Sequence, residues 1–169
     1  RHGESRVAKA ASDGTTRYWC ANGALTINPA LLPNPTVDTV RDLAPIARVL
    51  VMPSLLVVNN DVPAKSVAEL FALAKARPGQ LSYASPGVGG TPHLAMEMLK
   101  VAAGINVRHV PYAKGLTAAI IDVVAGNVDM VFGNLTDVLP HVRNKTLRAI
   151  AVGSAGRLPE LPGVPAVAE

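Results

Sequence analysis

Apolar and polar positions fall into two kinds of segment, which alternate regularly after residue 50. Short runs rich in Val, Ile, Leu and Ala predict buried strands, and the segments between them carry apolar residues at helical spacing. Alternating strands and helices indicate an α/β fold with parallel strands and helical crossovers. The predicted strands cover residues 50–59, 81–84, 107–111, 128–132 and 147–152. The predicted helices begin near residues 66, 91, 117 and 136.

Two of the predicted helices carry clear capping signals. Ser66 and Glu69 have the spacing of a capping box, in which each residue satisfies a free backbone N–H group. Thr91 is expected to cap the next helix, with Pro92 in its first turn and Gly104 at its end.

The two ends of the chain are less regular than its middle. Residues 19–21 are expected to form a strand, and the proline-containing residues 28–42 are expected to form a connection. The tail from Gly153 contains further prolines and is expected to be extended or looping.

Composition narrows the class of protein. Apolar residues make up 49% of the chain and aromatic residues 4%, so the core must be built from aliphatic side chains. The net charge is +4, but Lys and Arg form no basic run, which favours an ordinary surface over nucleic-acid binding. The single cysteine, Cys20, excludes an intrachain disulfide and a multi-cysteine metal site. No apolar run approaches the roughly 18–20 residues that span a bilayer, and residues 1–5 do not resemble a signal peptide.

The best candidate site is a glycine-rich loop between the strand at residues 81–84 and the helix that follows. Glycine lets the backbone approach a ligand closely, and a helix N-terminus presents N–H groups with partial positive charge. A carboxylate or phosphate is therefore the expected ligand. A strand–helix turn that binds nothing is an equally good interpretation of this pattern. The candidate ligand-binding residues are Ser85, Gly87, Gly89, Gly90, Thr91 and His93.

The loop does not fit a nucleotide-binding motif. Gly87 and Gly89 begin like the dinucleotide pattern G-x-G-x-x-G, but Pro92 stands where the third glycine is required. The Gly-Lys-Ser/Thr ending of a P-loop is absent as well. A nucleotide cofactor is therefore not expected.

Two further segments are weaker candidates for ligand contact, residues 22–24 and residues 133–134. In open α/β sheets ligands bind beyond the carboxyl ends of strands, and both segments follow a predicted strand. For residues 133–134 a plain turn is the favoured interpretation. The residues concerned are Asn22, Gly23, Ala24, Gly133 and Asn134.

No set of side chains indicates catalysis or metal binding. The histidines His2, His93, His109 and His141 lack metal-ligand spacing, and a G-x-S-x-G nucleophile motif is absent. His93 is expected to bond to the loop and orient it, His109 to be a satisfied core histidine, and His141 to lie at the surface. Glu69 is explained by capping. The chain is therefore not expected to be an enzyme or to bind a metal or cofactor.

Several short motifs follow one another in a fixed order. The run Gly-Gln-Leu-Ser-Tyr-Ala-Ser at residues 79–85 leads into the glycine loop, which is followed by His93-Leu94 and Glu97. Further motifs lie at residues 109–112, 125–129, 139–142, 145–152 and 161–165, and upstream at residues 7–11, 13–14, 27–29 and 42–45. On these motifs, nearly all of the chain resembles the substrate-binding proteins of tripartite tricarboxylate transporters, also called the Bordetella uptake gene (Bug) family.

The resemblance implies a type II periplasmic-binding-protein fold, in which two lobes close over a ligand. It assigns residues 1–52 to a partial first lobe and the crossover, and residues 53–151 to a complete second lobe with a sheet rich in parallel strands. Residues 152–169 would return towards the first lobe. Family chains are nearly twice as long, so the chain is expected to lack both ends of a family member.

The resemblance also implies a function. Family members are periplasmic receptors that capture small organic acids, mainly di- and tricarboxylates, and deliver them to a membrane permease. They hold carboxylates largely through backbone groups and bridging waters, which would place residues 85–91 in the second-lobe half of the site and residues 22–24 near the first-lobe side. Gly90 stands where Ser or Thr is frequent, which moves the hydroxyl role to Thr91. A ligand-sensing domain of a regulator and a truncated remnant that binds nothing remain as alternatives.

Overall fold

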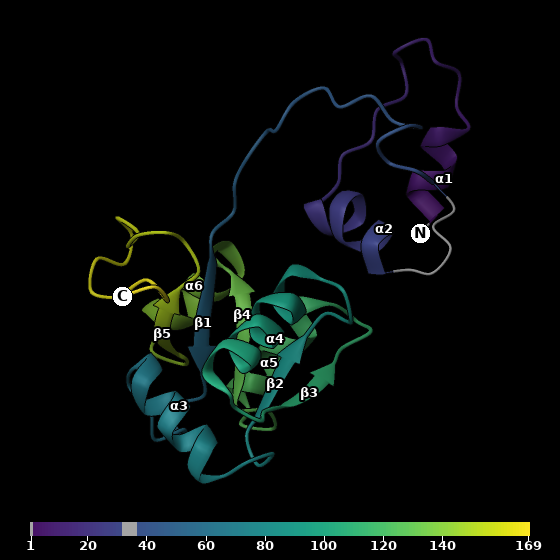
Figure 1. Ribbon diagram of the computed structural model, residues 1–169. Helices are drawn as coiled ribbons and strands as arrows, with labels where there is room; N and C mark the ends of the chain where they lie inside the picture. Colours follow the sequence, from purple (N-terminus) through teal and green to yellow (C-terminus); the bar gives the residue numbers. More distant parts are fainter. Residues whose placement is uncertain (1, 32–36) are drawn as a thin grey trace. The chain divides into compact units, whose positions relative to one another are not determined.

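The computed structural model describes residues 2–31 and 37–169 of the chain. The chain divides into two compact units, Arg1–Leu50 and Val51–Glu169. All five strands of the sheet lie in the second unit, together with four helices (Figure 1). The predicted α/β fold class is therefore confirmed.

The first unit is helical where it is regular. The sequence does not predict these helices, and the strand that it predicts at residues 19–21 is wrong. These residues form no regular structure, because a strand needs a hydrogen-bonded neighbour and none pairs with them within the described residues. The connection predicted at residues 28–42 begins with a helix, and residues 32–36 of it lie outside the described residues. The elements are α1 (His2–Ala8), the π-helix η1 (Gly23–Ile27) and α2 (Asn28–Leu31).

The second unit is built around one five-stranded sheet with the order β3-β2-β4-β1-β5. Its strands are β1 (Ser54–Val58), β2 (Ser82–Ser85), β3 (Arg108–Pro111), β4 (Met130–Asn134) and β5 (Arg148–Val152). Its helices are α3 (Val67–Ala76), α4 (Thr91–Ala103), α5 (Leu116–Val124) and α6 (Leu135–Arg143). All five predicted strands and four predicted helices are present, with ends shifted by a few residues. The largest shift is in β1, which begins only after Pro53, a residue without a backbone N–H group.

The sheet is rich in parallel strands, but the prediction of parallel pairing is wrong for β1. β2 pairs in parallel with β3 and β4, whereas β1 pairs antiparallel with both β4 and β5. Ser54, the first residue of β1, lies opposite Asn134, the last residue of β4. The chain thus enters β1 at the end of the sheet where β4 and the other strands finish, so β1 runs in the opposite direction to them.

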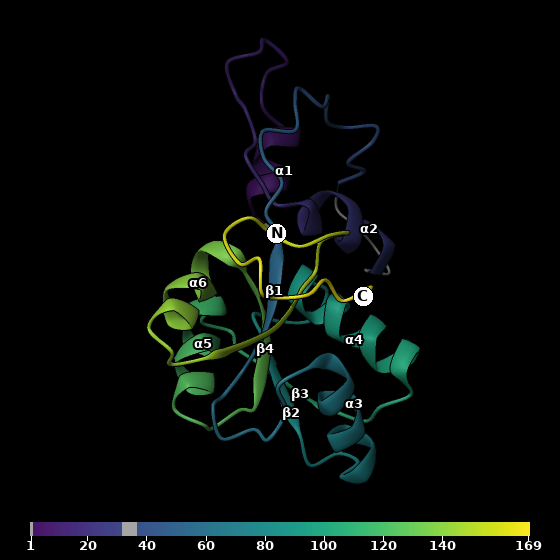
Figure 2. The same ribbon diagram turned by 90° about the vertical axis from the view of Figure 1, so that its left-hand side faces the viewer.

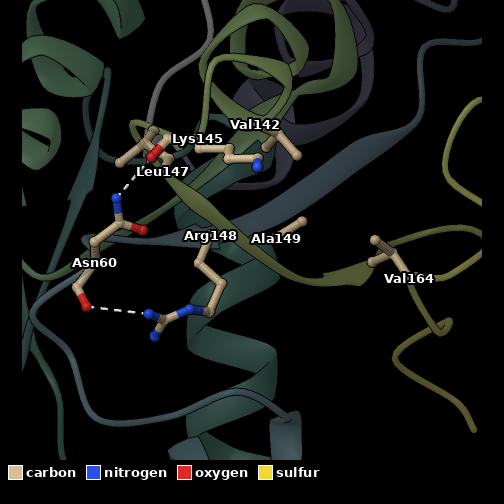
Figure 3. A pocket seen from close by; sticks show the side chains of 7 residues that line it. All are labelled: Asn60, Val142, Lys145, Leu147, Arg148, Ala149 and Val164. Atoms are coloured by element: carbon tan, nitrogen blue, oxygen red, sulfur yellow. Dashed lines mark hydrogen bonds between the residues drawn. The ribbon is translucent and has the colours of Figure 1, made fainter.

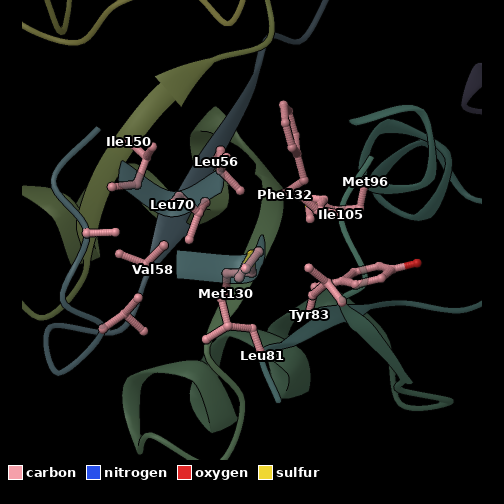
Figure 4. Packing of buried hydrophobic residues seen from close by; sticks show 14 residues of the cluster. Leu56, Val58, Leu70, Leu81, Tyr83, Met96, Ile105, Met130, Phe132 and Ile150 are labelled. Carbon is pink, nitrogen blue, oxygen red and sulfur yellow. The ribbon is translucent and has the colours of Figure 1, made fainter. Parts of the chain in front are cut away.

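Helices cover both faces of the sheet. Figure 2 shows α3 and α4 on one side of the sheet and α5 and α6 on the other. Successive side chains of a strand point to opposite faces, so Leu56 and Val58 of β1 join the core under α3 and α4, while Leu55 and Val57 join the core under α5 and α6. Figure 4 shows the first of these cores. Burial on both faces explains why the strands read as continuous apolar runs.

The capping prediction is confirmed for α3. Glu69 N donates to Ser66 Oγ at 3.1 Å, and the Glu69 carboxylate accepts from Lys65 N at 2.7 Å. The first bond satisfies an N–H group that the first turn of α3 leaves without an intrahelical partner, and the second holds Lys65 N, which lies one residue before the N-cap Ser66.

For α4 the predicted N-cap is wrong by one residue. Gly90 is the N-cap, because its backbone is extended with φ −77° and ψ 159°, whereas Thr91 already belongs to the helix. Gly104 ends α4 with the left-handed φ of 61° that favours glycine, as predicted.

The tail after β5 has little regular structure, as predicted, but it packs against the sheet. Ala166 forms a parallel bridge with Val152, and Leu158, Leu161 and Val164 contact the core under α5 and α6. The tail thus pairs with the last residue of β5. Among the described residues, no helix is long and apolar enough to cross a membrane.

Candidate functional site

The glycine loop joins the end of β2 to the start of α4. Ser85, the last residue of β2, is fully buried, and its hydroxyl lies at the centre of three contacts. It accepts a hydrogen bond from Gly87 N at 3.1 Å, donates to Gly87 O at 3.1 Å, and lies 2.7 Å from Nε2 of His109. The predicted site residue Ser85 therefore shapes the loop from inside.

Two glycines of the loop are required by the backbone. Gly87 has φ 136° and Gly89 has φ 84°, conformations that other residues rarely adopt. Gly90 has an ordinary φ, and the nearest atom to a Cβ placed there would be Gly87 O at 3.7 Å. A small side chain therefore fits at Gly90, where the resembling family often has Ser or Thr.

His93, in the first turn of α4, holds the loop from the other side. Gly89 N donates to His93 Nδ1 at 3.4 Å, so the predicted bond between His93 and the loop is present. Thr91 and His93 contribute N–H groups at the start of α4, and Pro92 contributes none. A carboxylate at this helix end would meet backbone N–H groups and the positive end of the helix dipole.

His109 is more than the satisfied core histidine that the sequence predicts. It is half-buried on β3, and its ring stacks on that of Tyr83 with centroids 4.7 Å apart. The His93 ring lies 4.5 Å from it, centroid to centroid. Two histidines, one from a strand and one from a helix, thus meet beneath the loop.

A series of hydrogen bonds between Tyr83 of β2 and two side chains of α4 lies next to these two histidines. Tyr83 OH donates to Glu97 Oε1 at 2.5 Å, and Lys100 Nζ donates to the same oxygen at 2.7 Å. Burial alone would raise the pKa of Glu97, but the hydrogen bonds from Lys100 and Tyr83 lower it below its ordinary value. Burial and the Glu97 carboxylate raise the pKa of Tyr83, which therefore stays a neutral donor. Figure 4 shows the Tyr83 hydroxyl pointing away from the other labelled core residues.

Sequence reasoning missed this support, although a signal was present. Tyr83 precedes Ser85 by two residues, which places both on one face of β2. His93, Glu97 and Lys100 are spaced i, i+4 and i+7, which places them on one face of α4. Pairing these two faces would have predicted the cluster.

The surroundings of His109 favour its neutral ring. Burial lowers the pKa of His109 below its ordinary value, and the neighbouring His93 acts in the same direction. The titratable groups that face the ring are Tyr83 from β2 and His93, Glu97 and Lys100 from α4; Glu97 opposes the shift and Lys100 adds to it.

We expect His109 to make the protein less stable in mild acid. Because its pKa is lower in the folded than in the unfolded state, its contribution is complete above a pH of about 6.5 and is lost as the pH falls towards the folded value. His109→Gln removes this titration, so the free energy of unfolding should fall less in the variant than in the wild type between about pH 7 and about pH 5. Urea denaturation at both pH values measures the difference. Equal falls in the two proteins would contradict the assignment.

The other predicted contact residues lie outside the glycine loop, and neither group forms the loop or turn that the sequence predicts. The prediction of a loop at residues 22–24 is wrong, because the chain is helical there: Gly23 begins η1, and Thr26 Oγ1 donates to Asn22 O at 2.9 Å. These residues, Ala24 among them, belong to the first unit. The prediction of a turn at residues 133–134 is also wrong, because both residues belong to β4.

Asn134 ends β4 at the same sheet edge as the glycine loop. β2 and β4 are parallel neighbours with Ala84 opposite Val131, so the chain leaves both strands in the same direction. Asn134 is also the N-cap residue of α6, and its Nδ2 donates to Asp137 Oδ2 at 2.9 Å. The structure thus brings Asn134 to the edge that carries residues 85–93.

A pocket of about 360 Å³ lies at the opposite end of the sheet, where β1 ends and β5 begins. Figure 3 shows two of its polar side chains engaged: the Arg148 guanidinium donates to Asn60 O, and Asn60 Nδ2 donates to Lys145 O. Arg148 also donates to Val62 O and Ala64 O. These groups hold the segment after β1, so the glycine loop is the better site. The pocket is lined by Asn60, Val142, Lys145, Leu147, Arg148, Ala149 and Val164. Within the described residues, no three His, Cys, Asp or Glu side chains are grouped to hold a metal ion.

Comparison with solved structures confirms the resemblance at the level of fold. Rpa4515 of R. palustris, solved with adipate, has a TM-score of 0.90 and 32% identity, over 97% of this chain and 55% of that chain. The periplasmic binding protein BugD has a TM-score of 0.83 and 28% identity, over 98% of this chain and 55% of that chain. The fold is that of periplasmic binding proteins of this kind.

Sequence comparison gives the same result. The UPF0065 protein in the tcbD-tcbE intergenic region of Pseudomonas sp. (strain P51) is 38% identical over 167 residues, which are 99% of this chain and 49% of that protein. The chain spans about half the length of such relatives. The sequence pattern of a family of transport receptors, described as tripartite tricarboxylate transporter family receptor, matches residues 3–169. The chain therefore belongs to the tripartite tricarboxylate transporter receptor family.

Proposed function

We propose that the protein is a periplasmic receptor that captures small organic acids, with di- and tricarboxylates as the main class. The observation that carries the proposal is the glycine loop at residues 85–91, which leads into the N-terminus of α4 in a receptor fold. Such a loop suits a carboxylate, because backbone N–H groups and the helix dipole both favour negative charge. The adipate in Rpa4515, a dicarboxylate in a similar protein, agrees with this class of ligand.

The protein would act by binding and release rather than by catalysis. Residues 53–151 would form the second lobe, residues 1–52 part of the first lobe and the crossover, and residues 152–169 the return towards the first lobe. A ligand that contacts both lobes favours the closed form over the open form. The loaded receptor would then deliver its ligand to membrane permease subunits of a tripartite transporter.

The ligand-contacting groups would be mostly backbone groups. Gly87 N is engaged by Ser85 and Gly89 N by His93. The amides proposed for the ligand are those of Gly90 and the first turn of α4, at the positive end of the helix dipole. Thr91 would supply the hydroxyl, and Asn134 would approach from the end of β4. Recognition through amides selects for charge and leaves the choice among organic acids to the shape of the closed site.

We expect adipate to stabilise the protein against unfolding. A ligand that binds only the folded state adds about 2 kcal/mol at thirtyfold excess over its dissociation constant. Hexanoate, which has the same chain length and one carboxylate fewer, should add much less, and citrate tests the tricarboxylate class. The measurement is the shift of the thermal unfolding midpoint with ligand concentration. No shift with any of these acids would contradict the proposal, and a shift with ATP alone would favour a nucleotide-binding function.

A pair of glycine variants locates the effect. Gly87→Ala places a side chain at φ 136°, where it strains the backbone of the loop. The affinity for adipate, measured from the thermal stabilisation, should therefore fall about tenfold. Gly163→Ala is the matched control, because no atom lies within 4 Å of a Cβ placed there. Gly163 is also distant in the sequence from the loop at residues 85–91. Equal responses of the two variants to adipate would place the site elsewhere.

A further inference from the structure

We infer that His109 is a positioning residue for the ligand loop, acting through the Ser85 hydroxyl. The inference rests on the proposed function, since it concerns the loop at residues 85–91. His109 lies on β3, outside the loop, and no part of the proposed site includes it. Its Nε2 is 2.7 Å from Ser85 Oγ, which is the shortest of the three contacts of that oxygen.

Counting protons assigns the direction of the bond. A serine hydroxyl has one proton to donate and two lone pairs that accept. Ser85 Oγ accepts from Gly87 N and donates to Gly87 O, so its third contact is satisfied only if His109 donates. His109 therefore carries its proton on Nε2. With all three bonds made, the hydroxyl has no capacity left for a ligand.

The consequence is a fixed conformation at Gly87. Its N–H and C=O groups are both held by one buried oxygen, and that oxygen is held by His109. The bonds hold Gly87 at φ 136°, which sets the direction in which the chain leaves β2. The amides at Gly90 and Thr91, which the proposed function assigns to the ligand, follow this turn.

His109 is itself held in place. Its ring stacks on Tyr83, whose hydroxyl is bonded to Glu97, and Glu97 is bonded to Lys100. The start of the loop is thus connected to the second half of α4, while His93 connects Gly89 to the first turn of the same helix. A loop that is hydrogen-bonded at both ends is already ordered before the ligand binds. Binding then does not have to offset the conformational entropy of ordering the loop.

The first arm of the test needs neither a variant nor a ligand. The ¹⁵N chemical shifts of the His109 ring, measured well above its pKa, show which nitrogen carries the proton. A proton on Nε2 is expected. A proton on Nδ1 would overturn the inference, because Ser85 would then have to give its only proton to His109 and leave Gly87 O.

The second arm compares two substitutions. Gln places an amide N–H group near the position of Nε2, whereas the shorter Asn does not reach it. In His109→Asn, hydrogen exchange of the Gly87 amide should accelerate about tenfold, the effect of losing one hydrogen bond of about 1.4 kcal/mol. His109→Gln should stay within about threefold of the wild type. The Gly79 amide is the internal control for a general destabilisation of the fold. It donates to Asn106 O in a hydrogen bond of 2.9 Å, and it does not belong to the glycine loop.

The third arm measures adipate binding. His109→Asn should weaken it about tenfold and His109→Gln should restore it to within about threefold of the wild type. Unchanged exchange at Gly87 in the Asn variant, or equal adipate affinity in the Asn and Gln variants, would overturn the inference. If the wild type binds no adipate, the proposed ligand class fails, while the ring tautomer and the exchange at Gly87 still decide the role of His109.

Discussion

Replacing Gly133 by alanine is expected to lower the free energy of unfolding by about 3 kcal/mol. Gly133 lies within β4, and a Cβ placed on it would be 2.4 Å from Cγ1 of Val138 on α6. Val138 is fully buried and β-branched, so its side chain has little freedom to turn away in a helix. The clash must therefore move α6 off the sheet or distort β4, and guanidinium denaturation measures the cost.

Two further variants separate this clash from the general effect of alanine. Gly163→Ala meets no atom within 4 Å and should change stability by less than about 1 kcal/mol. Val138→Ala removes the opposing methyl groups at a cost of about 2 kcal/mol, and adding Gly133→Ala to it should cost little more. Additive losses in the double variant would show that the two residues do not meet.

Gly133 also shows what the sequence could not predict. A glycine beside Asn134 is typical of a turn, yet here it is a strand residue whose missing side chain makes room for α6. The distinction depends on which helix packs over the strand, and that is a tertiary contact. In the same way, the direction of β1 depends on where the chain enters the sheet, which the apolar pattern of residues 50–59 does not record.

Local signals, by contrast, predicted the fold well. The capping pair Ser66 and Glu69 and the helix-ending Gly104 act within one turn of their own helices, so their roles can be read without the partner elements. The failed strand at residues 19–21 is the reverse case, since a strand requires a neighbour that the segment does not have within the described residues.

The candidate site divides along the same line. The glycine loop and its contact with His93 could be predicted, because the residues lie within nine positions of one another. The role of His109 could not, because β3 meets Ser85 only once β2 and β3 are paired in register. Its apolar neighbours in the sequence indicate a core strand and give no sign of the hydroxyl beside it.

Replacing Asn59 by leucine should lower the free energy of unfolding by about 3 kcal/mol, the cost of several lost hydrogen bonds at a buried position. Asn59 follows β1 and is only 7% exposed. Its Nδ2 donates to Val123 O at 2.8 Å and Val124 O at 3.2 Å, and its Oδ1 accepts from Asp61 N at 2.8 Å. Leucine has a similar size and makes none of these bonds, so Val124 O and Asp61 N lose the partner that Asn59 provides, while Val123 O keeps its bond from Gly126 N.

The neighbouring residue provides the matched control. Asn60 is exposed and makes one side-chain bond, to Lys145 O, so Asn60→Leu should cost less than about 1 kcal/mol. Urea denaturation of both variants measures the contrast, and equal losses would show that Asn59 does not cap α5. Asn59 hydrogen-bonds the end of α5 from its position directly after β1. A large loss of unfolding free energy in Asn59→Leu alone would therefore mean that polar contacts at the C-terminal end of β1 help to fix this antiparallel strand. The apolar side chains on both faces of β1 would then account for its burial between the two layers of helices. Asn59 would account for the point at which the chain leaves the strand.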